Sequence, residues 1–133
     1  MTNKHYELIQ QYYNEVSQET KDKYQGKTGI YAIYCDEALV YIGKSTDLLN
    51  RFIAHKANTF CDESPEYNSK KYQQLRKAAS LGHSITLKVL EFCAQDALAS
   101  TEDKWIGKYL PPLNAIIPAV NGKHIRKPIT DIC

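Results

Sequence analysis

Two short β-rich segments separated by three residues constrain the fold of this chain more than any other feature. Residues 29–35 and 39–43 are rich in β-branched and aromatic side chains, as strands are. Asp36, Glu37 and Ala38 lie between them, which predicts a tight antiparallel hairpin. Because side chains alternate along a strand, the length of this loop decides which side chains share a face of the sheet.

The loop length matters most for two tyrosines. With a three-residue loop, Cys35 pairs with Leu39 and Tyr31 pairs with Gly43, so Tyr31 and Tyr41 become diagonal neighbours on one face. With a two-residue loop, the two rings would point to opposite faces. A site that uses both tyrosines therefore predicts the three-residue loop, with open space over Gly43 beside the Tyr31 ring.

The spacing of apolar residues predicts the rest of the fold. Apolar residues three and four positions apart indicate helices, and strict alternation indicates a strand. The expected elements, in order, are a helix over residues 6–16, a polar linker over 17–27, a helix capped by Ser45 or Thr46 with Asp47 in its first turn, a helix over 66–81, a strand over 85–92, and a helix from Asp96 to Tyr109 that ends before Pro111-Pro112.

Composition narrows the class of protein only slightly. The formal net charge is +2, from 17 Lys and Arg against 15 Asp and Glu, so total charge does not indicate a nucleic-acid binder. No two of the four cysteines lie within four residues of each other, which excludes zinc-knuckle and redox CxxC spacings. The first 20 residues lack an apolar signal-peptide core, and no apolar run approaches membrane-spanning length. We expect a cytoplasmic protein with reduced thiols.

A carboxylate on the apolar face of the last predicted helix is the strongest single indication of a site. Glu102 falls in the series Leu98, Glu102, Trp105 and Tyr109, spaced four, three and four residues apart. An uncompensated charge on such a face is costly, so Glu102 requires a metal ion or a basic partner. A structural ion pair at the edge of the stripe is the alternative. The adjacent Asp103 is expected to point elsewhere, into solvent.

Each of the other candidate residues has an ordinary explanation when taken alone. Strand tyrosines such as Tyr31 and Tyr41 commonly pack in a core or at its rim. Lys44 is typical of a turn, and Arg51 is typical of a helix surface. His55 shares a helix face with Arg51 and is compatible with a hydrogen bond near the core. The case for a site therefore depends on the combination.

That combination resembles the GIY-YIG nuclease domain over about residues 28–114. The matching features, in order, are GIY at 29–31, YIGKS at 41–45, Arg51 with His55 one turn later, Glu102, and a PPLN run that ends at Asn114. Members of this family carry an Arg after the YIG triplet, a His or Tyr four residues further on, a metal-binding Glu, and a late Asn after a Pro. The hairpin spacing is similar to that of the excision-repair incision nucleases.

The resemblance implies an α+β fold with a small three-stranded antiparallel β-sheet flanked by helices. This chain adds an N-terminal helix to that fold. We therefore divide it into an N-terminal helix and linker over residues 1–27, a nuclease-like domain over 28–114, and a basic tail over 115–133 that packs on the domain.

The resemblance also implies a divalent-metal-dependent endonuclease that hydrolyses DNA to 5′-phosphate and 3′-hydroxyl ends. Glu102 would hold one Mg²⁺ or Mn²⁺ ion. Tyr31 would act as general base, and Tyr41 would position the water or phosphate or would itself be the base. Arg51 would neutralise charge at phosphorus. His55 would hydrogen-bond one of the tyrosines or a phosphate oxygen.

Three further residues are expected to bind substrate: Lys44, Ser45 and Asn114. Of these, Asn114 is better suited to bracing the active-site loop than to the chemistry. Because a free tyrosine has a pKa near 10, nearby cations must favour the Tyr31 phenolate, and Lys44, Arg51 and the metal are the candidates.

Two other functions stay open at this point. The chain is alternatively a nucleic-acid-binding module with the same fold and no cleavage, which acts through a partner. In a third interpretation it is a structural or regulatory protein in which the motif residues only pack. DNA is the expected partner, no membrane is involved, and a homodimer or a recruiting protein is left open.

DNA specificity does not follow from the motif. About 27 residues precede it and 19 follow Asn114, which we expect to be too few for an independent DNA-reading domain. The remaining sources of DNA contacts are the N-terminal helix, the helix with Lys70-Lys71 and Arg76-Lys77, and the tail with Lys123, His124, Arg126 and Lys127. The alternative for these charges is a solvated helix face.

Overall fold

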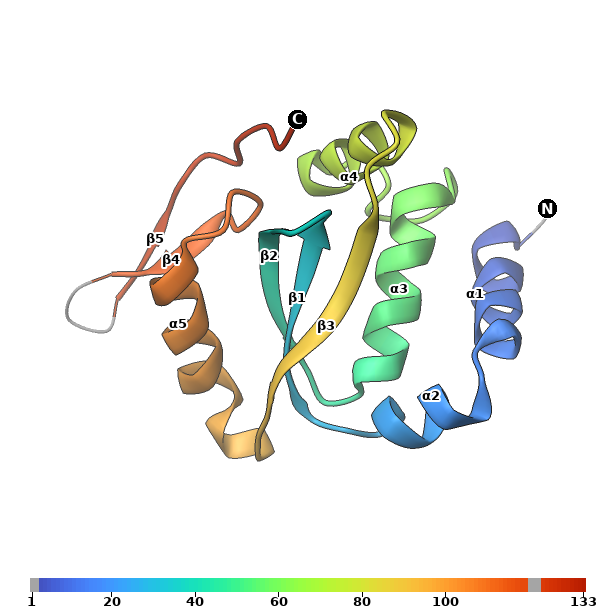
Figure 1. Cartoon of the computed structure of the whole chain (residues 1–133), viewed down its shortest axis with the longest axis horizontal. Helices are drawn as coiled ribbons and strands as arrows, with labels where there is room; N and C mark the ends of the chain where they lie inside the picture. The colour runs from blue at the N-terminus through green and yellow to red at the C-terminus, as the bar shows by residue number, and fades with distance from the viewer. Residues whose placement is uncertain (1–2, 120–122) are drawn as a thin grey trace.

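A computed structural model describes residues 3–119 and 123–133 of the chain (Figure 1). Its elements, in order, are α1 (Lys4–Glu15), α2 (Gln18–Tyr24), β1 (Gly29–Cys35), β2 (Ala38–Ser45), α3 (Leu48–Phe60), α4 (Lys70–Ser80), β3 (Ile85–Phe92), the 3₁₀ turn η1 (Gln95–Ala97), α5 (Leu98–Tyr109), β4 (Ile116–Pro118) and β5 (His124–Arg126). Parts of the predicted N-terminal segment (residues 1 and 2) and of the predicted tail (residues 120–122) lie outside the described residues.

The sheet confirms the predicted α+β class. Three antiparallel strands lie in the order β2-β1-β3, so β1 is central and β2 is an edge strand. Figure 1 shows α5 on one side of this sheet and α3 on the other, with α4 across one end. The third strand and the end of the last helix agree with the apolar spacing. The linker prediction was wrong, since residues 18–24 form α2, whose first turn is capped by the Ser17 side chain.

The hairpin turn is one residue shorter than predicted. Cys35 pairs with Ala38 rather than with Leu39, which leaves Asp36 and Glu37 as the turn. Asp36 adopts the left-handed conformation with φ 54°, which a non-glycine residue adopts only with compensation. Its carboxylate supplies that compensation by accepting hydrogen bonds from the backbone N–H of Ser84 and from a neighbouring histidine, both on the loop before β3.

A β-bulge restores the register that the shorter turn would have lost. Ile33 pairs with Tyr41, whereas Tyr34 pairs with Leu39, so Val40 is an extra residue in β2. One extra residue moves every later side chain of that strand to the other face. Tyr31 therefore pairs with Gly43 as expected, although the reason is a two-residue turn plus a bulge.

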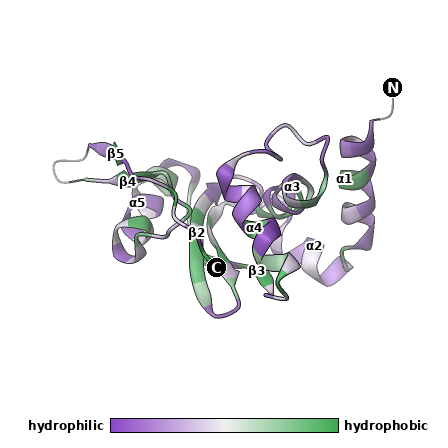
Figure 2. Cartoon of the chain, turned by 90° about the horizontal axis from the view of Figure 1, so that it is seen from above, coloured by the Kyte–Doolittle hydropathy of each residue, from purple (hydrophilic) through white to green (hydrophobic). Residues whose placement is uncertain are grey.

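The two faces of the sheet carry separate apolar cores. The core between the sheet, α3 and α4 contains Tyr31, Ile33, Cys35, Val40, Leu48, Tyr72, Leu75, Ala78 and Leu113. The core between the sheet and α5 contains Ile30, Ala32, Ile42, Leu98 and Ile106. Figure 2 shows the apolar colour concentrated on the strands between these helices. Because β2 is the edge strand, its side chains lie along the line where the two layers meet.

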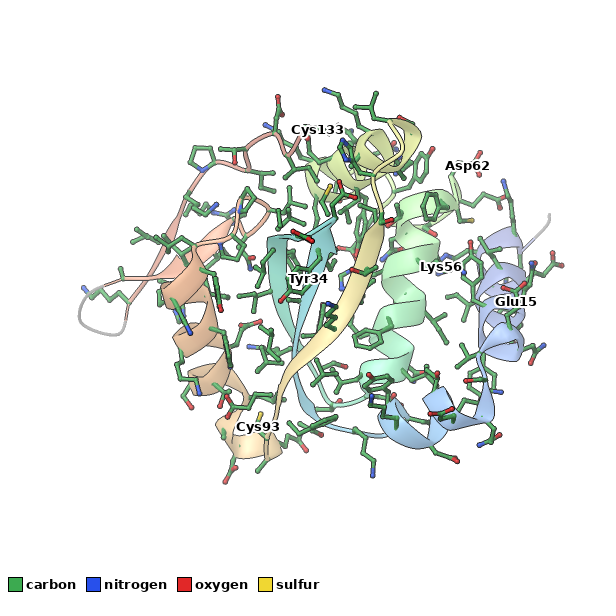
Figure 3. The ribbon with its side chains drawn as sticks, viewed as in Figure 1. Glu15, Tyr34, Lys56, Asp62, Cys93 and Cys133 are labelled. Atoms are coloured by element: carbon green, nitrogen blue, oxygen red, sulfur yellow. The ribbon has the colours of Figure 1, made fainter. Side chains whose placement is uncertain are left out.

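The N-terminal helices lie on the far side of α3 from the sheet (Figure 1). α1 has no buried residue, and one of its contacts with α3 is the Lys56 ammonium, 4.1 Å from the centre of the Tyr12 ring. Figure 3 shows Lys56 between the two helices. Within residues 3–119 and 123–133, no helix is long and apolar enough to cross a membrane.

The segment after Asn114 folds back onto the rest of the chain. β4 and β5 form a two-stranded antiparallel ribbon beside α5. Beyond it, the backbone N–H of Thr130 donates to the Pro112 carbonyl at 3.1 Å, and Asp131 accepts from the Gln74 amide at 3.0 Å. All four cysteines are free thiols, and Figure 3 shows Cys93 and Cys133 near opposite ends of the sheet.

Candidate active site

Tyr31 and Tyr41 share one face of the sheet. Their ring centres lie 6.3 Å apart at an interplanar angle of 45°. The Tyr31 ring lies over Gly43 on the paired strand, where a Cβ atom would come within 2.8 Å of the ring carbon Cε1. Glycine is required at this position because the tyrosine ring occupies the space that a side chain would need. Phe52 of α3 packs edge-on against the same ring at 5.7 Å.

A buried chain of hydrogen bonds extends from Tyr31 into α3 and α4. The Tyr31 hydroxyl contacts His55 Nε2, and His55 Nδ1 contacts the Tyr72 hydroxyl at 2.6 Å. The Asn58 amide donates to the Tyr72 oxygen at 3.4 Å and to the Glu66 carboxylate at 3.3 Å. The spacing of α4 identified Tyr72 only as an inner-face residue. Its polar role depends on a tertiary contact that spacing does not encode.

His55 is neutral in this environment. Burial is the main cause, and the charges of Lys71 and Arg51 add to it, lowering the pKa of His55 to about 2. A neutral imidazole has one N–H donor and one acceptor nitrogen. His55 is therefore unsuited to accept a proton from Tyr31 near neutral pH.

The two tautomers of neutral His55 give two possible directions for this chain of hydrogen bonds. If Nδ1 of His55 carried the proton, the Tyr72 oxygen would accept from both His55 and Asn58, and its own hydrogen would have no acceptor among the described residues. If Nε2 carries the proton, Asn58 donates to Tyr72, Tyr72 donates to Nδ1, and Nε2 donates to Tyr31. The hydrogen of Tyr31 then has no acceptor among the described residues, so each tautomer leaves one tyrosine hydrogen unpaired. We propose the second arrangement because it leaves that hydrogen on Tyr31, next to the cavity residue Tyr41. Tyr31 then keeps its own hydrogen.

Burial opposes ionisation of both tyrosines. It raises the pKa of Tyr31 well above 10, and the nearby Arg51 charge opposes this increase without reversing it. It also raises the pKa of Tyr41, with Glu102 acting in the same direction and Arg51 against it. Without a metal ion, Arg51 does not overcome the effect of burial at Tyr31, and the expectation that cations including the metal favour its phenolate stays a prediction. Lys44 is paired elsewhere.

Glu102 reaches the edge strand from the opposite layer. α5 covers the face away from Tyr31, and Glu102 Oε1 lies 3.6 Å from the Lys44 ammonium on β2. The Glu102 side chain is 19% exposed. Burial raises the pKa of Glu102, and Lys44 opposes this effect. Since 3.6 Å is longer than a good N–H···O bond, Lys44 partners this carboxylate only weakly. The site therefore straddles the edge of the sheet.

Two details of the α5 prediction were wrong. Tyr109 is 46% exposed, and Ile106 occupies the buried position instead, because the helix ends at Tyr109 and the chain turns at Leu110. Asp103 does not point away from the site. Its carboxylate contacts His124 Nε2 at 2.9 Å, and both residues line the same cavity as Glu102.

Two open cavities meet at Lys44. The larger, of about 660 Å³, is lined by Tyr41, Lys44, Glu66, Ser69, Lys70, Lys71, Glu102, Asp103, Ile106, Leu113, Asn114, Ala115, Ile116, His124 and Ile129. The smaller, of about 520 Å³, is lined by Lys44, Ser45, Thr46, Asp47, Asn50, Arg51, Ala54 and Leu98. Tyr31 lines neither cavity and is 1% exposed, so it lies behind Tyr41 rather than beside it.

Two of the expected substrate-binding residues hold the backbone in place. The Asn114 amide donates to the Ile42 carbonyl and accepts from the Ile42 N–H, both at 2.9 Å, as a neighbouring strand would. The Ser45 hydroxyl accepts from the Asp47 N–H at 3.0 Å and donates to the Asp47 carbonyl. This turn makes Asp47, rather than Ser45, the cap of α3. Arg51 is exposed on the first turn of that helix.

Glu102 is the residue of the large cavity best suited to a divalent cation. It is a partly buried, weakly paired carboxylate, and Mg²⁺ and Mn²⁺ prefer oxygen ligands and keep several waters. Among the residues described, Cys35, Asp36 and His83 bring three potential ligand atoms within 4.8 Å of one another. This group lies at the hairpin turn, at the other end of β2, where Asp36 already accepts hydrogen bonds from the loop before β3.

Comparison with known proteins places most of this site in one family. A family model described as the GIY-YIG catalytic domain matches residues 27–114. Neither the search of curated proteins nor that of solved structures found a match. The matched region contains β1, β2, β3, α3, α4 and α5, and it leaves out α1, α2, β4 and β5.

Proposed function

Because the chain belongs to the GIY-YIG catalytic domain family, we propose that it is a divalent-metal-dependent endonuclease that cuts DNA. The family implies a nucleic-acid substrate, and the products would be 5′-phosphate and 3′-hydroxyl ends. One observation carries the proposal: a tyrosine, a lysine and a weakly paired carboxylate (Tyr41, Lys44 and Glu102) converge on one open cavity from both sides of the edge strand.

Glu102 would hold the metal ion, with Mg²⁺ or Mn²⁺ suited to its oxygen ligand. When bound, the ion would supply positive charge to a phosphate oxygen and to the leaving 3′ oxygen. Lys44, only weakly paired with Glu102, would offer its ammonium to a phosphate oxygen. A partly buried carboxylate with a raised pKa and one distant cationic partner fits this role.

We assign the general base to Tyr41 rather than to Tyr31. A base must reach the attacking water, and Tyr41 lines the cavity whereas Tyr31 does not. In the proposed tautomer, Tyr31 accepts a hydrogen bond from His55 and keeps its own hydrogen, which suits a donor. Tyr41 would first lose its hydroxyl proton to solvent. In the step, its phenolate takes a proton from water, the water oxygen bonds to phosphorus, and the bond from phosphorus to the 3′ oxygen breaks. The 3′ oxygen then gains a proton from solvent.

Arg51 would stabilise the charge that develops on the phosphate. It lies on the second cavity next to Lys44, and a guanidinium presents two parallel donors to phosphate oxygens. Its charge also opposes the effect of burial on the pKa of Tyr41, which favours the phenolate. A single site of this kind cuts one strand at a time, so a double-strand break would require a dimer or two successive nicks.

Nicking of supercoiled plasmid DNA tests the proposal. The wild-type protein should relax the plasmid with Mg²⁺ and lose this activity with a chelator, and both Glu102→Gln and Tyr41→Phe should abolish it. Glu91→Gln is a matched control, because Glu91 contacts Lys104 and Trp105 of the same helix from β3. Binding of DNA without any cutting by the wild-type protein would reject the proposal.

A further inference from the structure

The N-terminus of α4 faces the same cavity as Glu102, and its residues take no part in the proposed cleavage step. Ser69 is the residue before the helix, and its side chain makes no capping hydrogen bond. The Ser69 hydroxyl oxygen is buried, and among the described residues it has no hydrogen-bond partner. Buried polar atoms are nearly always satisfied by protein, ordered water or a ligand, so this hydroxyl at the border of a cavity has a hydrogen bond to offer to a bound molecule.

The backbone at this helix end also has donors to offer. The first N–H groups of an α-helix have no acceptor within the helix, and here no side chain of the N-cap supplies one. The first turn of α4 contains no acidic residue that would offset the positive end of the helix dipole. Such a helix end is suited to an anion.

Lys71 adds a charge that lacks an ionic partner. Its ammonium lies 4.3 Å from the centre of the Tyr41 ring and 4.7 Å from the centre of the Tyr72 ring. Among the described residues, no carboxylate lies within salt-bridge distance of it; Glu66 is the nearest influence of opposite sign. Burial is the main cause that lowers the pKa of Lys71 to about 8; the Glu66 charge opposes this effect, and the Arg51 charge adds to it. A bound anion would reverse that effect.

Most of the other charges of the cavity contact a partner of opposite sign, and Glu66 is the exception among the described residues. Glu102 pairs weakly with Lys44 and Asp103 contacts His124, whereas Glu66 keeps its negative charge, because the Asn58 amide that donates to it is neutral. The unmatched positive charge therefore lies at α4, where the exposed Lys70 precedes Lys71. Since the cavity continues from Lys71 past Tyr41 to Glu102, an anion at α4 and a phosphate at Glu102 are accommodated in one connected space.

From these features we propose that Ser69, Lys70, Lys71 and the first N–H groups of α4 form a phosphate subsite. It would hold a phosphate of the substrate strand adjacent to the one that is cut. The inference rests on the proposed nuclease function and extends it, because it assigns strand positioning to a helix outside the signature residues. It also distinguishes α4 from the N-terminal helices, which lie on the far side of α3.

Binding of a short DNA duplex, measured by fluorescence anisotropy against salt concentration, tests the subsite. In a Glu102→Gln background, which prevents cutting, Lys71→Met should weaken binding about tenfold and reduce the salt slope by about one. Lys71→Arg should restore most of the affinity. Lys77→Met is the matched control, because Lys77 lies in the last turn of the same helix, away from the cavity, and should leave both quantities unchanged.

Ser69→Ala separates a ligand role from a structural one. Because the hydroxyl makes no hydrogen bond within the described protein, its removal should leave the melting temperature unchanged while it weakens DNA binding severalfold. Normal affinity and salt slope in Lys71→Met, in a wild-type protein that cuts DNA, would overturn the subsite and leave the nuclease intact. A wild-type protein that neither cuts nor binds DNA would instead refute the proposed function.

Discussion

Tyr72→Phe tests the direction of the buried hydrogen-bond chain. The change removes one hydroxyl and leaves the ring, so packing against Lys71 and His55 persists. His55 Nδ1 then loses its only donor among the described residues, and Asn58 keeps Glu66 as an acceptor. One buried acceptor without a partner costs about 1–3 kcal/mol. We expect the free energy of unfolding in urea to fall by about this amount.

The effect on activity follows from the tautomer of His55. In the proposed arrangement the Tyr72 hydroxyl donates to Nδ1, which places the proton on Nε2 opposite Tyr31. Without it the two tautomers become comparable, so about half of the molecules keep the proton on Nε2 and the nicking rate should fall about twofold. The control is Tyr67→Phe, whose ring stacks on Arg76 at 3.5 Å. Ring ¹⁵N shifts that place the wild-type proton on Nδ1 would refute the reasoning.

Three further predictions concern stability. Gly43→Ala should cost about 1–3 kcal/mol and abolish nicking, because the new Cβ overlaps the Tyr31 ring, whereas Gly107→Ala, which meets only Pro118 at 3.6 Å, should be tolerated; urea unfolding of the pair checks this. Asn114→Ala should cost about 2–4 kcal/mol, since the Ile42 N–H and carbonyl both lose their partner; a smaller loss in the same assay would mean that water replaces the amide. His55 has a folded pKa of about 2 against about 6.5 when unfolded, so the unfolded chain binds the extra proton and stability falls as pH drops below 6.5, by roughly 1.4 kcal/mol per unit. The difference in unfolding free energy between wild type and His55→Gln should shrink over that range, and a constant difference would contradict the buried neutral state.

The hairpin shows how far the sequence can predict local geometry. Alternation correctly predicted that Tyr31 pairs with Gly43 and shares a face with Tyr41. Alternation did not predict how this register arises. A three-residue loop gives the same pairing beyond Val40 as a two-residue turn followed by a bulge. The deciding contact is the link from Asp36 to the loop before β3, which lies 48 residues away in the chain. Periodicity carries no information about such a link.

The site shows the same limit on a larger scale. The spacing of α5 correctly indicated that Glu102 is partly buried with a basic partner, but not that α5 covers the opposite face from Tyr31. The polar role of Tyr72 and the orphan hydroxyl of Ser69 depend on packing between helices. One feature of the sequence does bear on the proposed subsite. Ser69 precedes a helix that starts with two lysines and has no early acidic residue, and such a helix end suits an anion.

Resealing of nicked plasmid by DNA ligase tests the central claim most directly. Ligase joins only a 5′-phosphate to a 3′-hydroxyl, so it reports both the bond that is cut and the ends that remain. The wild-type protein with Mg²⁺ should produce nicks that ligase closes completely, and Glu102→Gln should produce none. Nicks that ligase leaves open, or equal nicking by Glu102→Gln, would contradict the account.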